Sequence, residues 1–167
     1  MCPLIIHKVS IAAAVGLFPA IVLAQTTSST ANFTGMWKMD ESRSELAAQD
    51  QPVGEFTIAI TQTGSVLKVE TTRDGKKDTA MYPFVAHPTA TTNEWNGTPR
   101  AYWEGAALVD EGSLDIDGQS VGFREARTSS PDGSEMVVET TLKIQHGYEL
   151  KGGQTIVSGK NVFVRRH

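Results

Sequence analysis

The stretch FTGMWKMD, residues 33–40, decides the fold that this sequence predicts. With the two-residue period of a β-strand, Phe33, Gly35, Trp37 and Met39 share one face, and the more polar residues between them share the other. The pattern predicts the first strand of a closed sheet. An ordinary amphipathic strand with a core tryptophan is the alternative on these residues alone.

The chain before this strand has the pattern of a secretory signal peptide. Lys8 precedes an apolar run over residues 9–24 that ends in Val22-Leu23-Ala24, where a signal peptidase prefers small residues. The run is shorter than the ~20 apolar residues of a spanning helix, although an uncleaved anchor is the alternative. We therefore expect a signal peptide over 1–24, a flexible leader over 25–31, and one domain over 32–167 in a secreted or periplasmic protein.

Beyond the opening strand, turn signals separate short alternating runs about every ten residues, which is typical of antiparallel strands. These signals include Asp74-Gly75, Asn96-Gly97, Asp117-Gly118 and the segment 131–133. The connections are too short for crossover helices. The sequence predicts an all-β fold, a single antiparallel up-and-down β-barrel of eight to ten strands, with a short helical segment around residues 41–48 after the first strand.

Composition and motifs argue against several classes of function. The formal net charge is −4 with scattered charges, so nucleic acid is not an expected partner. The single cysteine lies in the expected signal peptide, so a mature chain would have no disulfide. No nucleophile elbow, phosphate loop or dinucleotide fingerprint occurs. Acidic residues that could serve acid–base chemistry are placed by alternation mostly on solvated faces, and they are Glu104, Asp110, Glu111 and Glu125.

Metal and modification motifs are weak in this sequence. His87, His146 and His167 are isolated, so we expect no metal site, and haem bound through His87 or His146 is an unfavoured alternative. The segment DIDGQS begins like a calcium loop at Asp115 but lacks the final acid, so we interpret it as a turn. Asn32 and Asn96 match the N-glycosylation pattern.

The glycine and tryptophan of FTGMWKMD, together with the basic pair of VFVRR at the chain's end, resemble the lipocalin and fatty-acid-binding-protein superfamily of calycins. More loosely, FTGMWKMD and the later WEG are similar to small secreted bacterial lipocalin-like proteins of unknown function. The resemblance implies that Gly35 lets the backbone approach closely, that Trp37 closes one end of the barrel, and that Arg165, or Arg166 in the other phase, covers its ring.

The same resemblance implies that a small apolar or amphipathic molecule binds inside the barrel. The arginine and tyrosine that hold a fatty acid's carboxylate in fatty-acid-binding proteins are replaced here by Asn161 and Phe163. We expect the pocket to be lined by Tyr82, Trp103, Phe123 and Met136, with Arg124 or Arg127 as the polar anchor. The alternatives are a cavity-free barrel acting as a surface or protein-interaction module and, third, a barrel enzyme of the isomerase or cyclase type. The sequence does not define the oligomeric state.

Overall fold

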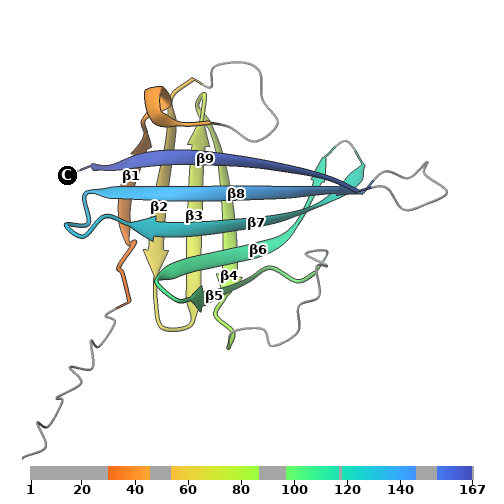
Figure 1. The fold of residues 1–167 in the computed structure, drawn as a ribbon, viewed down its shortest axis with the longest axis horizontal. Coiled ribbons are helices and arrows are strands. Elements are labelled where there is room, and N and C mark those ends of the chain that lie inside the picture. The colour runs from red at the N-terminus through yellow and green to blue at the C-terminus, as the bar shows by residue number, and fades with distance from the viewer. Residues whose placement is uncertain (1–29, 46–53, 87–96, 117, 146–153, 167) are drawn as a thin grey trace, which may run out of the picture.

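The computed structural model describes residues 30–45, 54–86, 97–116, 118–145 and 154–166. They form one nine-stranded antiparallel sheet that curls into a nearly closed barrel (Figure 1). Its strand order is β4-β3-β2-β1-β9-β8-β7-β6-β5. The strands are β1 (Gly35–Met39), β2 (Phe56–Gln62), β3 (Val66–Arg73), β4 (Lys76–Pro83), β5 (Arg100–Glu104), β6 (Ala107–Ile116), β7 (Gln119–Ser129), β8 (Glu135–Gln145) and β9 (Gln154–Arg166).

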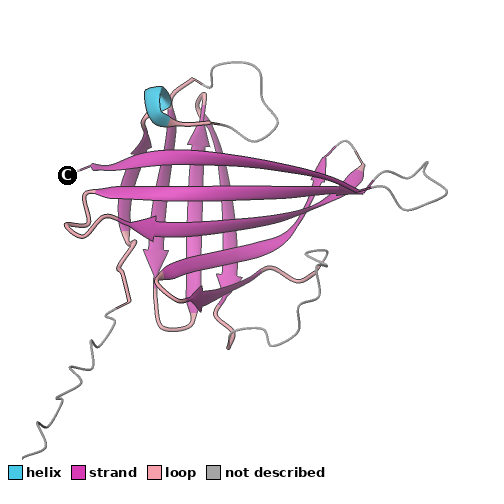
Figure 2. Cartoon of the chain, viewed as in Figure 1, coloured by secondary structure: helices cyan, strands magenta, loops and turns pink. Residues whose placement is uncertain are grey.

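The predicted fold class is confirmed, and the strand count lies within the expected range. The helical segment is shorter than predicted: in the described part of the chain, helix is confined to the 3-10 turn η1 (Glu41–Arg43), shown in Figure 2. Asp40 caps this turn by accepting a 3.1 Å hydrogen bond from the backbone N–H of Ser42. The remainder of the predicted segment, residues 46–48, lies outside the described residues. No described helix has the length and apolar character needed to cross a membrane.

Short turns and the meeting of the two chain ends set the topology. At the β3–β4 turn, Asp74 and Gly75 both have positive φ, 49° and 76°, which the Asp-Gly pair tolerates and the hairpin's twist requires. The first and last strands then pair in antiparallel fashion, which places Trp37 directly opposite Arg165. Between β4 and β5 the contact is a parallel bridge from Phe84 to Ala101, so the barrel is closed only narrowly there.

The inner face of the barrel follows the predicted alternation. Phe33, Trp37 and Met39 are buried, as the opening stretch predicts, and Met136 and Val138 are buried on β8. Their partners across the sheet continue the same face around the barrel. The resulting apolar core is made of Phe33, Trp37, Met39, Ile58, Ile60, Leu67, Val69, Tyr82, Ala101, Leu108, Phe123, Met136, Val138 and Phe163. This core positions the groups that point inward.

Candidate ligand-binding site

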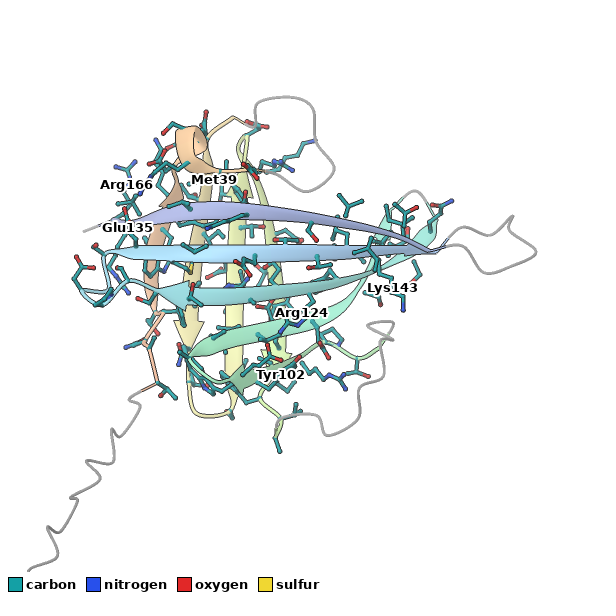
Figure 3. All side chains as sticks on the ribbon, in the orientation of Figure 1. Met39, Tyr102, Arg124, Glu135, Lys143 and Arg166 are labelled. Atoms are coloured by element: carbon teal, nitrogen blue, oxygen red, sulfur yellow. The ribbon has the colours of Figure 1, made fainter. Side chains whose placement is uncertain are left out.

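The end of the barrel at Trp37 is closed by tightly packed side chains. The Trp37 side chain is fully buried, and its indole N–H donates a 2.8 Å hydrogen bond to the Phe33 carbonyl. The guanidinium carbon of Arg165 lies 4.1 Å from the centroid of the Trp37 ring. Arg166, labelled in Figure 3, is exposed. Of the two arginines that the resemblance offers, Arg165 is therefore the one that covers the tryptophan.

A charged cluster lies inside the barrel on β6 and β7, farther from this closed end. Asp110 and Glu125 are direct partners across the two strands, and Arg127 is two residues from Glu125 on the same face. Arg127 forms ion pairs with both carboxylates. The Asp110 side chain is completely buried and that of Arg127 is 1% exposed. The sequence-based expectation that these acids lie mostly on solvated faces is wrong for Asp110 and Glu125, because their strand positions face the interior.

Several polar atoms in this interior have no partner among the described residues. Apart from the ion pair between Asp110 and Arg127, the second carboxylate oxygen of Asp110 and Nε of Arg127 lack a hydrogen bond within the described chain. The same is true of Oδ1 of Asn161. Asn161 pairs with Val138, which pairs with Arg127, so these residues form one row across β9, β8 and β7. Buried polar atoms are normally paired, so these unpartnered atoms make the row the candidate site.

Accessibility changes along the inner face. At the closed end Trp37 and Met136 are fully buried, whereas the Glu125 side chain keeps 30% of its surface exposed. Its β8 partner Thr140 is half-buried, although it occupies an inward position. The interior is therefore packed solid near Trp37 and reached by solvent near Glu125.

Burial shifts the pKa of three groups in this cluster. Burial raises the pKa of Glu125 to about 7, and the hydrogen bond from Thr140 opposes that rise. Burial also lowers the pKa of Arg127 to about 10 and raises that of Tyr82 to about 12, the latter with a contribution from Glu125. Near neutral pH, Glu125 therefore titrates, Arg127 carries its positive charge and Tyr82 is a neutral phenol.

The structure brings together only part of the predicted pocket. Tyr82 and Phe123 meet edge to face inside the barrel, with ring centroids 6.1 Å apart, and Phe123 is two residues from Glu125. Trp103 instead stacks on Phe33 at the closed end, with centroids 6.3 Å apart. Met136 is also packed there, in the row next to the Trp37–Arg165 pair. Both residues therefore pack against the closed end. Trp103 also lies opposite Leu108, which in turn pairs with Arg127.

Arg124 lies on the outer surface of the barrel, so it does not serve as an anchor inside it. It pairs with Glu104, and Tyr102 contributes to its electrostatic environment. Tyr102, labelled with Arg124 in Figure 3, donates a 3.1 Å hydrogen bond to Glu111, which is also buried on this outer side. Of the two arginines considered from the sequence, Arg127 is the inward one. Glu104 alone of the four acids considered is exposed.

Asp110 and Asn161 were not among the predicted pocket residues. A signal for Asn161 was present, because it is two residues from Phe163 in the last strand and therefore shares its inward face. For Asp110 the signal was its two-residue spacing from the apolar Leu108. In both strands the other face also carries apolar residues, such as Val109 and Val162, so the sequence does not show which face is inward.

The predicted absence of a metal site is not tested by the histidines, because residues 87, 146 and 167 lie outside the described residues. Within the described chain, no group of three or more potential metal ligands gathers. At the DIDGQS turn, the Gly118 N–H donates a 3.0 Å hydrogen bond to Asp115, as expected of a turn.

Two clefts of about 490 and 590 Å³ lie outside the barrel, on either side of residues 30–32. The first is bordered by the β7–β8 turn, where Asp132 already accepts hydrogen bonds from Ser130 and Ser134. These hydrogen bonds hold the pKa of Asp132 at about 2. Neither cleft contains a buried side-chain charge, so the barrel interior remains the candidate site.

No family model and no curated protein matches this chain. Among solved structures, a single-residue mutant of the fluorescent protein UnaG is 16% identical, with a TM-score of 0.47, over 81% of this chain and 96% of that one. The complex of bradavidin2 with biotin is 15% identical, with a TM-score of 0.40, over 80% and 96%. Likeness at this level carries no information about a ligand. The fold itself defines the class, a small antiparallel up-and-down barrel.

Proposed function

We propose that this protein binds one small amphipathic molecule inside its barrel. The observation that carries the proposal is the row from Arg127 to Asn161, where completely buried or nearly buried side chains retain polar atoms without partners. The polar part of the ligand would meet this row and Asp110. Its apolar part would lie against Tyr82 and Phe123, which supply aromatic surface beside the same cluster.

The accessibility gradient supports the same location. A barrel with about this many strands is just wide enough to be filled by side chains or to hold one small molecule. The half-buried inner residues near Glu125 favour the second case for this part of the barrel, whereas the buried side chains near Trp37 fill the other part. A ligand would displace water from the half-buried surface, and its polar group would pair with the unpartnered atoms of this row.

Mass spectrometry of protein purified without denaturation from its native source tests this function. Solvent extraction should release one dominant small molecule in an amount near one per chain. Added back to the stripped protein, that molecule should be recovered chemically unchanged. Its conversion into a product would favour the isomerase or cyclase alternative, and ligand-free protein that binds no lipid, pigment or haem would favour the cavity-free interaction module.

We also propose that the chain acts after export, on the strength of Lys8 and the apolar run that follows it. N-terminal sequencing of the protein from its native source should then find a start at or near Gln25. An intact Met1 on membrane-embedded protein would contradict export as a cleaved, secreted or periplasmic protein.

A further inference from the structure

The charges around the unpartnered atoms restrict the kind of head group that the barrel accepts. Arg127 is the one cation of the cluster, and two carboxylates, Asp110 and Glu125, already pair with it. Arg127 therefore has no charge left over for a further anion. A carboxylate ligand would add a further negative charge to a largely buried site without a free cation to receive it, which is costly.

The unpartnered atoms also favour a head group other than a carboxylate. Two of the three side chains involved, Asp110 and Asn161, offer oxygen acceptors, and Arg127 offers one N–H. A head group with at least one N–H or O–H donor can pair with these oxygens, and a carbonyl on the same group can accept from Arg127 Nε. A carboxylate has no hydrogen to donate, so it would leave both acceptors unpaired.

Other charged side chains also occupy inward positions. They are Arg73, Lys76 and Asp78 on β3 and β4, and the last two are exposed to water. Arg73 lies 5.7 Å from the centroid of the Phe56 ring. These charges are screened by solvent and contribute less than those of the buried cluster.

We infer that the ligand carries a neutral or singly cationic head group with hydrogen-bond donors, such as an amide, a urea or an amine, and not a carboxylate. This inference rests on the proposed function, since it concerns the same interior site. It assigns Asp110 and Asn161 the recognition of the donors and Arg127 the recognition of an adjacent acceptor.

Competition between three ten-carbon molecules that differ in their head group tests the inference. Nile red, a neutral dye, is bound to the stripped protein, and decanamide, decylamine and decanoate are compared as displacing agents at one pH and ionic strength. We expect decanamide or decylamine to displace the dye at a concentration about tenfold below that of decanoate, which corresponds to about 1.4 kcal/mol. Equal displacement by all three, or preferential displacement by decanoate, would overturn the inference and leave ligand binding intact. A failure of Nile red to bind saturably would overturn both the proposed function and this inference.

Variants locate the preference in the named residues. Asn161→Leu should weaken decanamide about tenfold relative to decanoate, whereas the control Arg124→Gln, on the outer face of β7, should leave their ratio unchanged. The double variant Asp110→Asn/Glu125→Gln leaves Arg127 as an unpaired cation and should shift the preference towards decanoate. Circular dichroism and thermal unfolding identify any variant that does not fold. If Asn161→Leu folds and keeps the parent's ratio, Asn161 does not recognise the donor and the inference is wrong.

Discussion

The guanidinium of Arg165 covers the ring of Trp37 at 4.1 Å and also ties the N-terminal segment to the end of the sheet. It donates hydrogen bonds to the backbone carbonyls of Gly133, Thr34 and Asn32 at 2.8, 2.7 and 3.1 Å. One side chain from the last strand thus joins the first strand, the residues before it and the β7–β8 turn. The closed end depends on this contact.

Removal of Trp37 should destabilise the barrel most at this end. Because the side chain is fully buried, Trp37→Ala should lower the free energy of unfolding by about 3–5 kcal/mol. Arg165→Ala should cost less, about 1–3 kcal/mol, since it loses a cation–π contact and partly exposed hydrogen bonds. Arg166→Ala, in the exposed neighbour, is the control and should change stability by less than about 0.5 kcal/mol. Urea unfolding measures all three, and a Trp37→Ala protein as stable as the parent would contradict the closed end.

Gly35 should not tolerate a side chain. Its φ is 144°, and an added Cβ would lie 2.6 Å from Nη1 of Arg165. Gly35→Ala should therefore destabilise the protein by about 1–3 kcal/mol through backbone strain and displacement of the arginine. Gly64→Ala is the matched control, because a Cβ there meets no atom within 4 Å. In an Arg165→Ala background part of the Gly35→Ala cost should disappear. If Gly35→Ala is equally destabilising in that background, the clash with Arg165 does not contribute to its cost.

The buried ion pair should show strong coupling. Arg127→Gln leaves Asp110 charged and unpaired, so it should cost about 3–5 kcal/mol, and the double variant Arg127→Gln/Asp110→Asn should cost less than the sum of the single variants. The same double-mutant cycle applied to Arg124 and Glu104, a pair on the outer face, should give a coupling energy of only about 0–1 kcal/mol. Comparable coupling energies in the two cycles would contradict the interior placement of Arg127.

Glu125 should make the protein less stable as the pH rises. Its ordinary pKa is 4.5 and its pKa in the folded protein is about 7, so between these values the folded state holds more protons than the unfolded state. The free energy of unfolding should fall across this window by up to about 3 kcal/mol. Glu125→Gln should remove this slope, and Glu104→Gln on the outside should not. Urea titrations at several pH values compare them, and an unchanged slope in Glu125→Gln would refute the assignment.

The sequence predicted the barrel because local alternation and Asp-Gly turns determine strands and hairpins. Phe33, Trp37 and Met39 all face inward as the opening stretch indicates. The row from Arg127 to Asn161 was harder to predict, since it depends on the register of several strands. Glu125 and Arg127 are one and three positions from Arg124, and only pairing with Asp110 and Val138 shows which arginine faces the interior. No local pattern predicts that Trp103 packs against Phe33.

The central claim is that a ligand occupies the barrel interior beside Glu125, and a blocking variant tests it most directly. Thr140 and Thr141 are adjacent half-buried residues of β8 that face the inside and the outside respectively. Nile red fluorescence should show saturable binding near one dye per chain in the parent and in Thr141→Trp. Thr140→Trp should fold, as judged by circular dichroism, but lose dye binding by at least about tenfold because the indole fills the interior space. Undiminished binding to folded Thr140→Trp would contradict a ligand site inside the barrel.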